Sequence, residues 1–412
     1  MQNKTFKSLF ISYDGLTDPL GQSQILPYII GLAHAGFKMT ILSCEKKDRF
    51  KEKEELIQSI CKANNIEWVP LLFHKSPPIL AKYYDLFNLK KTARKLYLEN
   101  RYNIIHCRSY LSAEIGRELK KKYGARYLFD MRGFWVDERV DGGLWNTKYA
   151  FYRFAYKKYK HKEALLIADA DHIISLTEAG KKEIRTWQSY KNSTPITVIP
   201  CSADLNLFTL TDDAQQLKAK DELRVKKTTF VLSYLGSLGT WYLLEEMLLL
   251  FKAINDHYKV AKFLILTPDD PDIVYKKAAT LGLGKKDFII RFVERRNVPF
   301  LIKASDLSVS FIKPAYSKIA SSPTKLGELL AMGIPVICNS IGDVEMIIDK
   351  SGGGAIMNEF KEVNFKQVIK SFPALLSKDK TLIRKNIQDY YSLSNAIDIY
   401  DKVYRQLLNV NN

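Results

Sequence analysis

Residues 321–337 combine residue types that could bind a phosphorylated ligand. The segment reads SSPTKLGELLAMGIPVI. A Ser-Ser-Pro triplet is typical of a helix start, so we expect Pro323 in the first turn and Ser321 or Ser322 as its cap. Thr324 and Lys325 then follow in the same turn. The unpaired amides of such a helix start attract phosphate.

Glu328 lies further along the same predicted helix, about one and a half turns from its start. Its carboxylate could accept two hydrogen bonds from a ribose diol. Gly333 is expected to end the helix, and residues 335–337 to begin a buried strand. The simpler interpretation is an ordinary surface helix between two strands. The segment favours a nucleotide site, because the serines, the proline and Glu328 occur together.

Other candidate groups follow predicted strands in the first half of the chain. His106 and Arg108 come after one strand, and Asp130 and Arg132 after the next. Asp130 or His106 could act as a base toward a substrate hydroxyl, and Arg108 or Arg132 could stabilise a departing phosphate. The alternative is that Asp130 and Arg132 only pair with each other or cap helices.

A glycine-bearing loop follows the first predicted strand and contains Asp14, Gly15, Gly21 and Gln22. Glycine lets backbone approach a ligand, so the loop is a candidate for acceptor or phosphate binding. Turns need glycine about as often, which is the alternative explanation.

Short apolar runs alternate with helical patterns along the whole chain. This alternation predicts α/β domains with doubly wound parallel sheets, whose ligands sit beyond the carboxyl ends of the strands. A chain of 412 residues exceeds what one core usually supports, so we expect two domains. We expect strands at 8–13, 39–44, 67–73, 103–107, 126–130, 172–176, 196–200, 229–235, 262–267, 288–292, 307–311 and 335–339. We expect helices at 23–35, 51–64, 83–99, 112–123 and 149–168 in the first half.

Composition narrows the class of protein. The five cysteines are scattered without a CxxC pair, which favours a reducing cytoplasm and argues against a zinc site. No apolar stretch approaches the roughly 20 residues that span a bilayer. We therefore expect a cytoplasmic protein, soluble or peripheral on the inner face of the cytoplasmic membrane.

The net charge of +18 is concentrated in the first half of the chain. Residues 77–95 and 148–162 interleave aromatic and basic side chains, a mixture that suits an anionic membrane surface. The alternative is a pair of helices with core-facing aromatics and solvated lysines. We expect no nucleic acid partner, because no recognised binding motif accompanies the charge.

Four segments together resemble the family 4 (group 1) glycosyltransferases, which have the GT-B fold. They are the donor segment 321–337, the glycine loop 14–24, the VIPCSAD stretch from Val198, which is similar to the family's IPNGVD segment, and the YLGSLG loop 234–239. The resemblance implies two Rossmann-like domains facing across a cleft, with the last helix returning to the first domain. The expected acceptor domain is 1–204 with 390–412, and the expected donor domain is 205–389.

This resemblance implies a transfer of sugar from a nucleotide-diphosphate sugar to a lipid-linked or polysaccharide acceptor. The implied reaction retains configuration, uses no metal or cofactor, and serves bacterial surface polysaccharide biosynthesis such as lipopolysaccharide or capsule. The expected donor-binding residues are Glu328, Lys325, Ser321, Ser322, Pro323, Thr324, Gly236, Ser237, Lys318 and Arg295.

The chain departs from the family pattern at two places, one expected to contact the donor sugar and one expected to contact the diphosphate. Ala320 stands where many members have a glutamate, and Gly236 is followed by Ser237 rather than a cation. We expect Lys325 or Lys318 to neutralise the leaving group instead.

Two other functions remain open. A 2-epimerase of the same fold would convert a nucleotide sugar without an acceptor. A nonenzymatic basic protein would bind polyanions in a strongly salt-dependent way, and no nucleotide diphosphate would stabilise it.

Overall fold

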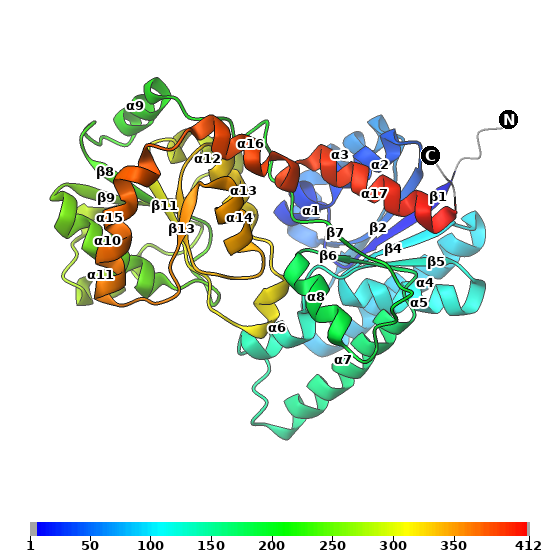
Figure 1. Ribbon diagram of the computed structural model, residues 1–412. Helices are drawn as coiled ribbons and strands as arrows, with labels where there is room; N and C mark the ends of the chain where they lie inside the picture. Colours follow the sequence, from blue (N-terminus) through cyan, green and yellow to red (C-terminus); the bar gives the residue numbers. More distant parts are fainter. Residues whose placement is uncertain (1–5, 410–412) are drawn as a thin grey trace. The chain divides into compact units, whose positions relative to one another are not determined.

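The computed structural model describes residues 6–409, except for the side chains of Pro78 and Ile79. Contacts divide the chain into two compact units. Figure 1 shows the chain coloured along its sequence. Unit 1 comprises Met1–Cys201, Tyr316–Ser321 and Leu393–Asn412, and unit 2 comprises Ser202–Ala315 and Ser322–Ser392. Residues 1–5 and 410–412 of the predicted domain ranges, and two side chains of the predicted membrane segment 77–95, lie outside the described part.

Unit 1 is built on a seven-stranded parallel sheet in the order β3-β2-β1-β4-β5-β6-β7. Most strand residues are buried, as expected for a parallel sheet covered by helices on both faces. The strands are β1 (Lys7–Ser12), β2 (Lys38–Lys46), β3 (Glu67–Phe73), β4 (Ile104–Arg108), β5 (Arg126–Asp130), β6 (His172–Ser175) and β7 (Ile196–Val198).

Two helical layers cover this sheet, each with its own apolar core. One layer contains α2 (Leu26–His34), α3 (Lys47–Ala63) and α17 (Leu393–Leu408). The other contains α4 (Pro78–Asn100), α5 (Ser109–Tyr123) and α7 (Ala150–Ala168). The return of the last helix to the first domain is confirmed, because α17 packs against α2. Shorter elements complete the unit: α1 (Pro19–Gln24), α6 (Trp135–Asp141), α8 (Glu178–Thr186) and the 3-10 helix η3 (Tyr316–Ala320).

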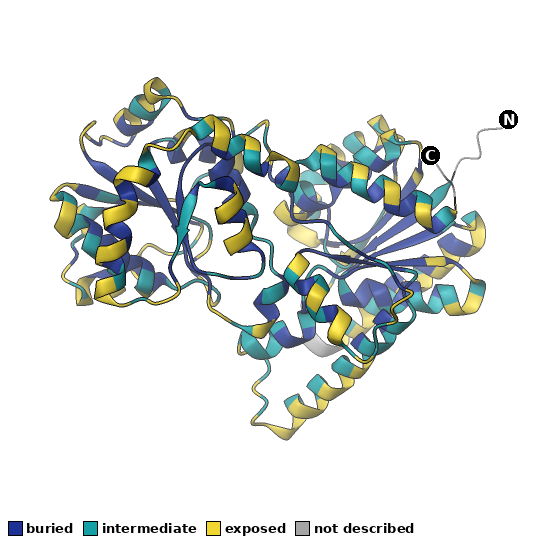
Figure 2. Cartoon of the chain, in the orientation of Figure 1, coloured by how far each residue is buried: buried dark blue, intermediate teal, exposed yellow. Residues whose placement is uncertain are grey.

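Unit 2 repeats the scheme with six parallel strands in the order β10-β9-β8-β11-β12-β13. Figure 2 shows dark, buried residues along its strands and exposed residues on the outer sides of its helices. The strands are β8 (Phe230–Leu235), β9 (Ala261–Leu266), β10 (Phe288–Arg291), β11 (Leu307–Ser310), β12 (Val336–Cys338) and β13 (Gly354–Ile356). The helices are α9 (Asp213–Glu222), α10 (Leu244–Tyr258), α11 (Asp272–Thr280), α12 (Val298–Ile302), α13 (Thr324–Ala331), α14 (Val344–Ser351), α15 (Glu362–Leu376) and α16 (Lys380–Tyr391).

The strand order places a topological switch point in each unit. The order reverses between β1 and β4 in unit 1 and between β8 and β11 in unit 2. Ligands of doubly wound sheets bind beyond the carboxyl ends of the strands at such points. The loops after β1, β4 and β8 are therefore where ligands are expected.

Most of the predicted elements are present, and the differences concern short elements. The single helix predicted at 23–35 is two helices, because Ile25 leaves the helical conformation just before Leu26-Pro27. The structure also has the short helix α6 at Trp135–Asp141, where no helix was predicted. The prediction also lacks β13, which is only three residues long and too short to produce an alternation. Within residues 6–409, none of the helices is long and apolar enough to cross a membrane.

Candidate functional site

The glycine loop after β1 is held from inside by the carboxylate of Glu45. This side chain is completely buried at the end of β2. Its two oxygens accept hydrogen bonds from the amides of Leu16 (2.8 Å) and Thr17 (3.0 Å), from the Thr17 hydroxyl (2.6 Å) and from the Ser43 hydroxyl (2.6 Å). Sequence reasoning missed Glu45. The signal in the sequence is a carboxylate directly after the apolar and small residues 41–44 of the strand.

The two glycines of this loop are required by close packing of the backbone. A Cβ atom at Gly21 would lie 2.1 Å from the carbonyl oxygen of Gly15, and one at Gly15 would lie 2.5 Å from Glu45 Oε2. The Gln22 side chain donates to the Thr17 carbonyl at 2.9 Å. The observed geometry thus supports the turn explanation for these glycines, and the predicted role in ligand binding stays a prediction.

His106 and Asp130 lie at neighbouring strand ends beneath α17, and each is 1% exposed. His106 Nδ1 is 2.9 Å from the Tyr404 hydroxyl, Tyr400 donates to Asp130 Oδ2 at 3.0 Å, and His106 Nε2 is 3.5 Å from that oxygen. Burial lowers the pKa of His106 more than Asp130 raises it. Burial acts to raise the pKa of Asp130, but Arg132 and His106 together hold it below its usual value.

The structure therefore brings the two predicted bases together, as a neutral imidazole beside an ionised carboxylate. Neither side chain has appreciable solvent exposure in this structure. We infer that both position Arg132, whose guanidinium Nη1 lies 3.9 Å from Asp130 Oδ1, rather than take a proton from an acceptor.

Arg108 and Arg132 present two guanidinium groups at the same edge of the sheet. Arg108 donates to the Gln24 carbonyl at 3.3 Å, and its Nε lies 3.8 Å from Asp14 Oδ2. Arg132 has a left-handed backbone with φ of 58° and contacts Cys201 Sγ at 3.2 Å. Such conformations concentrate at functional sites. All four predicted catalytic residues thus lie within one cluster of unit 1.

In unit 2, Glu328 and Arg295 form an ion pair. Glu328 is 3% exposed on α13, and its Oε1 accepts a hydrogen bond from Arg295 Nη2 at 2.6 Å. Burial raises the pKa of Glu328, and the Arg295 guanidinium partly opposes that shift. Arg295 itself is half exposed. The structure thus joins two of the predicted donor-binding residues, which lie 33 positions apart.

Lys325 lies beside the glycine loop that follows β8. Its ammonium is 3.1 Å from the Tyr234 hydroxyl and 3.7 Å from the centre of the Tyr242 ring. A Cβ atom at Gly236, which has φ of 123°, would lie 2.8 Å from Lys325 Nζ. Tyr234 in turn donates to the Ser237 carbonyl at 2.5 Å. Three predicted donor-binding residues, Gly236, Ser237 and Lys325, therefore share one site at the carboxyl end of β8.

We predict that Lys325→Met stabilises the free protein at neutral pH by about 2 kcal/mol. Burial lowers the pKa of Lys325 to about 7, below its unfolded value, so folding is penalised at every pH where the unfolded chain holds the proton. The penalty is complete below pH 7 and disappears as the pH rises toward the unfolded value. Urea unfolding of both proteins checks this, and the gain from the substitution must shrink between pH 7 and pH 10. An equal gain at both values would contradict the prediction.

The start of α13 differs from the expectation. Pro323 is the N-cap itself, with an extended ψ of 107°, and the helix begins at Thr324. The prediction that Ser321 or Ser322 is the N-cap is therefore wrong. The predicted end is confirmed, because Gly333 has φ of 70° and donates to the Leu330 carbonyl just beyond the last turn.

The predicted donor-binding residues are divided between the two units, which the sequence did not predict. Residues 316–321 belong to unit 1, and the chain from residue 322 belongs to unit 2. Lys318 Nζ lies 2.5 Å from Glu138 Oε1, and the Ile319 carbonyl accepts from the Thr177 hydroxyl at 2.8 Å. Lys318 is thus placed in unit 1 with α6, whereas Lys325 is in unit 2. Within the described residues, no group of three or more His, Cys, Asp or Glu side chains could hold a metal ion.

Both units have a doubly wound parallel sheet with the same order of the first six strands. Each sheet has charged residues near its switch point. These features define a GT-B type protein. Residues 28–207 match the family described as glycosyltransferase family 4, and residues 215–374 match glycosyl transferases group 1. The chain belongs to this family of glycosyltransferases. The predicted family is confirmed. No curated protein matches the sequence significantly.

Solved structures with low sequence identity share the fold over nearly the whole chain. Sucrose-phosphate synthase from Thermosynechococcus elongatus matches with a TM-score of 0.69 and 15% identity, covering 98% of this chain and 99% of that one. HepE from Anabaena, in complex with UDP and glucose, matches with a TM-score of 0.66 and 14% identity, covering 98% of this chain and 99% of that one. WaaG, a glycosyltransferase involved in lipopolysaccharide biosynthesis, matches with a TM-score of 0.64 and 14% identity, covering 95% of this chain and 99% of that one. The predicted GT-B fold is confirmed.

Proposed function

We propose that this glycosyltransferase moves a sugar from a nucleotide-diphosphate sugar to a lipid-linked or polysaccharide acceptor, with retention and without a metal ion. Unit 2 binds the donor and unit 1 binds the acceptor. The observation that carries the proposal is the joint placement of Lys325 with the Gly236 loop at the end of β8, on the helix that also bears the buried Glu328.

In the proposed complex, the diphosphate lies against Lys325 and the first-turn amides of α13. A helix start and a desolvated ammonium both stabilise the charge that develops on a departing phosphate. The ribose lies at Glu328, whose carboxylate has about four acceptor positions when it is ionised. Arg295 occupies one of these positions in this structure, so ribose binding uses the remaining ones.

The proton of the acceptor hydroxyl is assigned to a phosphate oxygen of the donor. His106 and Asp130 are buried and already paired with tyrosines of α17. A donor phosphate, by contrast, lies next to the anomeric carbon that the hydroxyl attacks. Attack by the acceptor hydroxyl on the face of the sugar ring from which the phosphate departs gives retention of configuration.

The comparisons support a nucleotide-sugar donor and leave the acceptor to experiment. HepE was solved with UDP and glucose, and WaaG is described as acting in lipopolysaccharide biosynthesis. Sucrose-phosphate synthase shows that the same fold also occurs in an enzyme outside that pathway. We propose bacterial surface polysaccharide biosynthesis for this chain, because its basic and aromatic helices suit a membrane-held acceptor.

A thermal-shift panel of UDP, GDP, ADP, CDP and dTDP, followed by the matching nucleotide sugars, tests the donor assignment. One nucleotide family is expected to raise the melting temperature, because a ligand that binds only the folded state stabilises it. Slow release of free sugar from the matching donor, with its anomeric configuration followed by NMR, then tests the reaction. The proposal is wrong if no nucleotide diphosphate stabilises the protein.

We also propose that unit 1 docks on an anionic membrane through the exposed aromatic side chains of α4 and α7. On α4 these are Tyr83, Tyr84 and Phe87, and on α7 Phe151 and Phe154 are each about two-thirds exposed. The two helices are neighbours, because the Lys82 ammonium of α4 lies 5.8 Å from the Tyr159 ring of α7. Exposed aromatics flanked by lysines suit the boundary between lipid headgroups and acyl chains.

The double substitution Phe151→Ser and Phe154→Ser is expected to lower binding to phosphatidylglycerol vesicles about tenfold or more, because both rings leave the headgroup boundary. Co-sedimentation with vesicles measures this. Phe292→Ser is the matched control, since Phe292 is equally exposed but lies in unit 2. Equal binding to neutral and anionic vesicles, or no effect of the double substitution, would contradict the proposal.

A further inference from the structure

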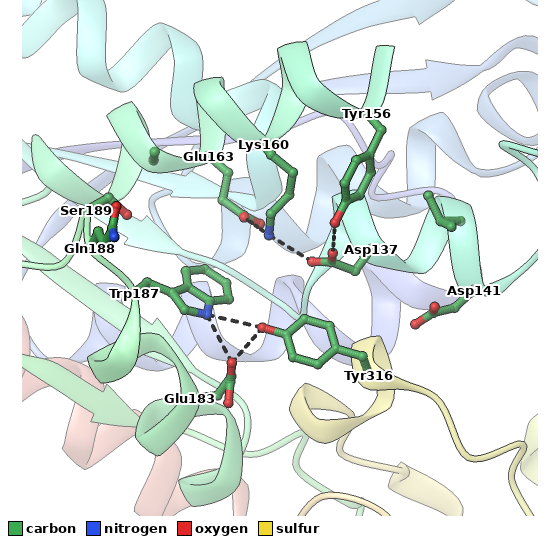
Figure 3. Close-up of a pocket in the computed structure, with 12 residues that line it drawn as sticks. Asp137, Asp141, Tyr156, Lys160, Glu163, Glu183, Trp187, Gln188, Ser189 and Tyr316 are labelled. Atoms are coloured by element: carbon green, nitrogen blue, oxygen red, sulfur yellow. Dashed lines mark hydrogen bonds and ion pairs between the residues drawn. The ribbon is translucent and has the colours of Figure 1, made fainter. Parts of the chain in front are cut away.

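Unit 1 contains a cavity of about 630 Å³ that the proposed catalytic cluster does not use. Its walls come from α6, α7, α8 with the turn that follows it, and Tyr316 (Figure 3). The α6 wall begins at Trp135, five residues beyond the carboxyl end of β5. The volume is that of a pocket for one or two small rings.

One side of the cavity is an aromatic platform held in place by hydrogen bonds. Trp187 Nε1 donates to the Tyr316 hydroxyl at 3.1 Å and to Glu183 Oε1 at 3.2 Å. The Tyr316 hydroxyl donates to the same Glu183 oxygen at 2.7 Å. Phe134 packs against both rings, with centroids 5.0 Å from Trp187 and 5.5 Å from Tyr316. The two rings are thus oriented before any ligand binds.

The opposite side is polar, and its groups are linked to one another. Asp137 accepts from the Tyr156 hydroxyl at 2.8 Å and from Lys160 Nζ at 3.0 Å. Lys160 also contacts Glu163, which is 2% exposed and accepts from the Tyr110 hydroxyl at 2.6 Å. Lys160 Nζ also lies 4.6 Å from the centre of the Trp187 ring, so the polar group reaches the aromatic side there. Figure 3 shows the carboxylate of Asp137 across the pocket from Tyr316.

The charge of the lining is opposite to that of the protein. Among the described residues that line the cavity, four are carboxylates, namely Asp137, Asp141, Glu163 and Glu183, and Lys160 is the one cation. The whole chain carries +18. Lys160 is itself paired with two of the carboxylates. A phosphate or uronate entering the cavity would therefore meet net repulsion, because like charges in a partly desolvated site repel strongly.

Aromatic faces with nearby carboxylates suit a sugar ring. The C–H face of the sugar ring packs on Tyr316, which is 40% exposed, because the Lys160 ammonium covers the Trp187 ring at 4.6 Å. The sugar hydroxyls donate to carboxylate oxygens, which accept stronger hydrogen bonds than neutral groups. An amino sugar would add an attraction for the excess negative charge. We propose that this cavity binds a neutral or amino sugar ring of the acceptor and excludes acidic sugars. This inference rests on the proposed function, because it names the acceptor for the same enzyme.

Saturation-transfer NMR with methyl glycosides of glucose, galactose, N-acetylglucosamine, glucosamine and glucuronic acid tests the assignment. At least one neutral or amino glycoside is expected to bind the wild-type protein, and the glucuronide is not. Glu183→Gln is expected to weaken that binding about tenfold, because a charged acceptor becomes neutral and the platform loses its anchor. Trp187→Phe is a second variant that keeps a ring in place while removing both indole hydrogen bonds.

Glu178→Gln is the matched control, because Glu178 lies on the same helix but does not line the cavity. It is expected to leave glycoside binding unchanged. Thermal shift with the best nucleotide diphosphate is read on every variant, so that loss of the donor site is distinguished from loss of this one. The inference is overturned if the glucuronide binds as well as the others, if no glycoside binds, or if Glu183→Gln and Trp187→Phe leave binding unchanged while nucleotide binding persists.

Discussion

Glu328→Gln is expected to lower the affinity for the best nucleotide diphosphate by about 100-fold, since hydrogen bonds to a charged group contribute about 1.5–3 kcal/mol each. Glutamine keeps the size of the side chain but removes the charge that a ribose diol would contact. It also leaves Arg295 without its counter-charge at 2.6 Å. Isothermal titration calorimetry with wild-type and variant protein gives the ratio of dissociation constants.

The control for this substitution is Glu294→Gln. Glu294 lies next to Arg295 in sequence and pairs with Arg296 at 2.9 Å, but both partners of that pair are largely exposed. An exposed pair contributes about 0–1 kcal/mol, so nucleotide affinity should change little. If Glu328→Gln binds the nucleotide as tightly as Glu294→Gln does, the ribose assignment is wrong.

Glu45→Ala is expected to destabilise the protein by about 3–5 kcal/mol, because each buried donor left without an acceptor costs about 1–3 kcal/mol and several lose theirs. Two backbone amides and two hydroxyls depend on this carboxylate. The backbone of the glycine loop that they hold is closely packed, since a Cβ atom at Gly21 would lie 2.1 Å from the Gly15 carbonyl oxygen. Urea unfolding followed by circular dichroism measures the loss.

Glu54→Ala provides the comparison, because Glu54 is exposed on α3, the helix that follows the β2 strand of Glu45. Surface substitutions of this kind usually change stability by less than about 0.5 kcal/mol. Similar unfolding midpoints for the two variants would show that the loop does not depend on Glu45.

The order of strands and helices could be predicted because it is a local property. Apolar runs at the positions of β1, β5 and β8 are short, rich in branched and aromatic residues, and followed by glycine or charged side chains. Such patterns depend on neighbours within a few residues. The elements that were not predicted correctly are short, and a short element gives little local pattern. Strand β13 has only three residues, and helix α1 has only six.

The candidate site could be predicted only as a set of residue types. Lys325 next to Gly236 and Arg295 next to Glu328 are contacts between segments that are far apart in the chain. Nothing in the sequence specifies that the Lys325 ammonium lies against two tyrosine rings and is therefore poorly solvated. The same is true of Lys318, whose partner Glu138 is 180 positions away.

The sequence by itself determined the fold class, the family and the residues that bear charge at the strand ends, because periodicity and motif spacing are encoded in adjacent residues. Only the tertiary structure decided how deeply those residues are buried and which groups they contact. Tyr400 and Tyr404 of the last helix bury Asp130 and His106, which the sequence presents as bases. Burial and hydrogen-bond partners set the reactivity of an ionisable group, and both come from segments that meet only when the chain folds.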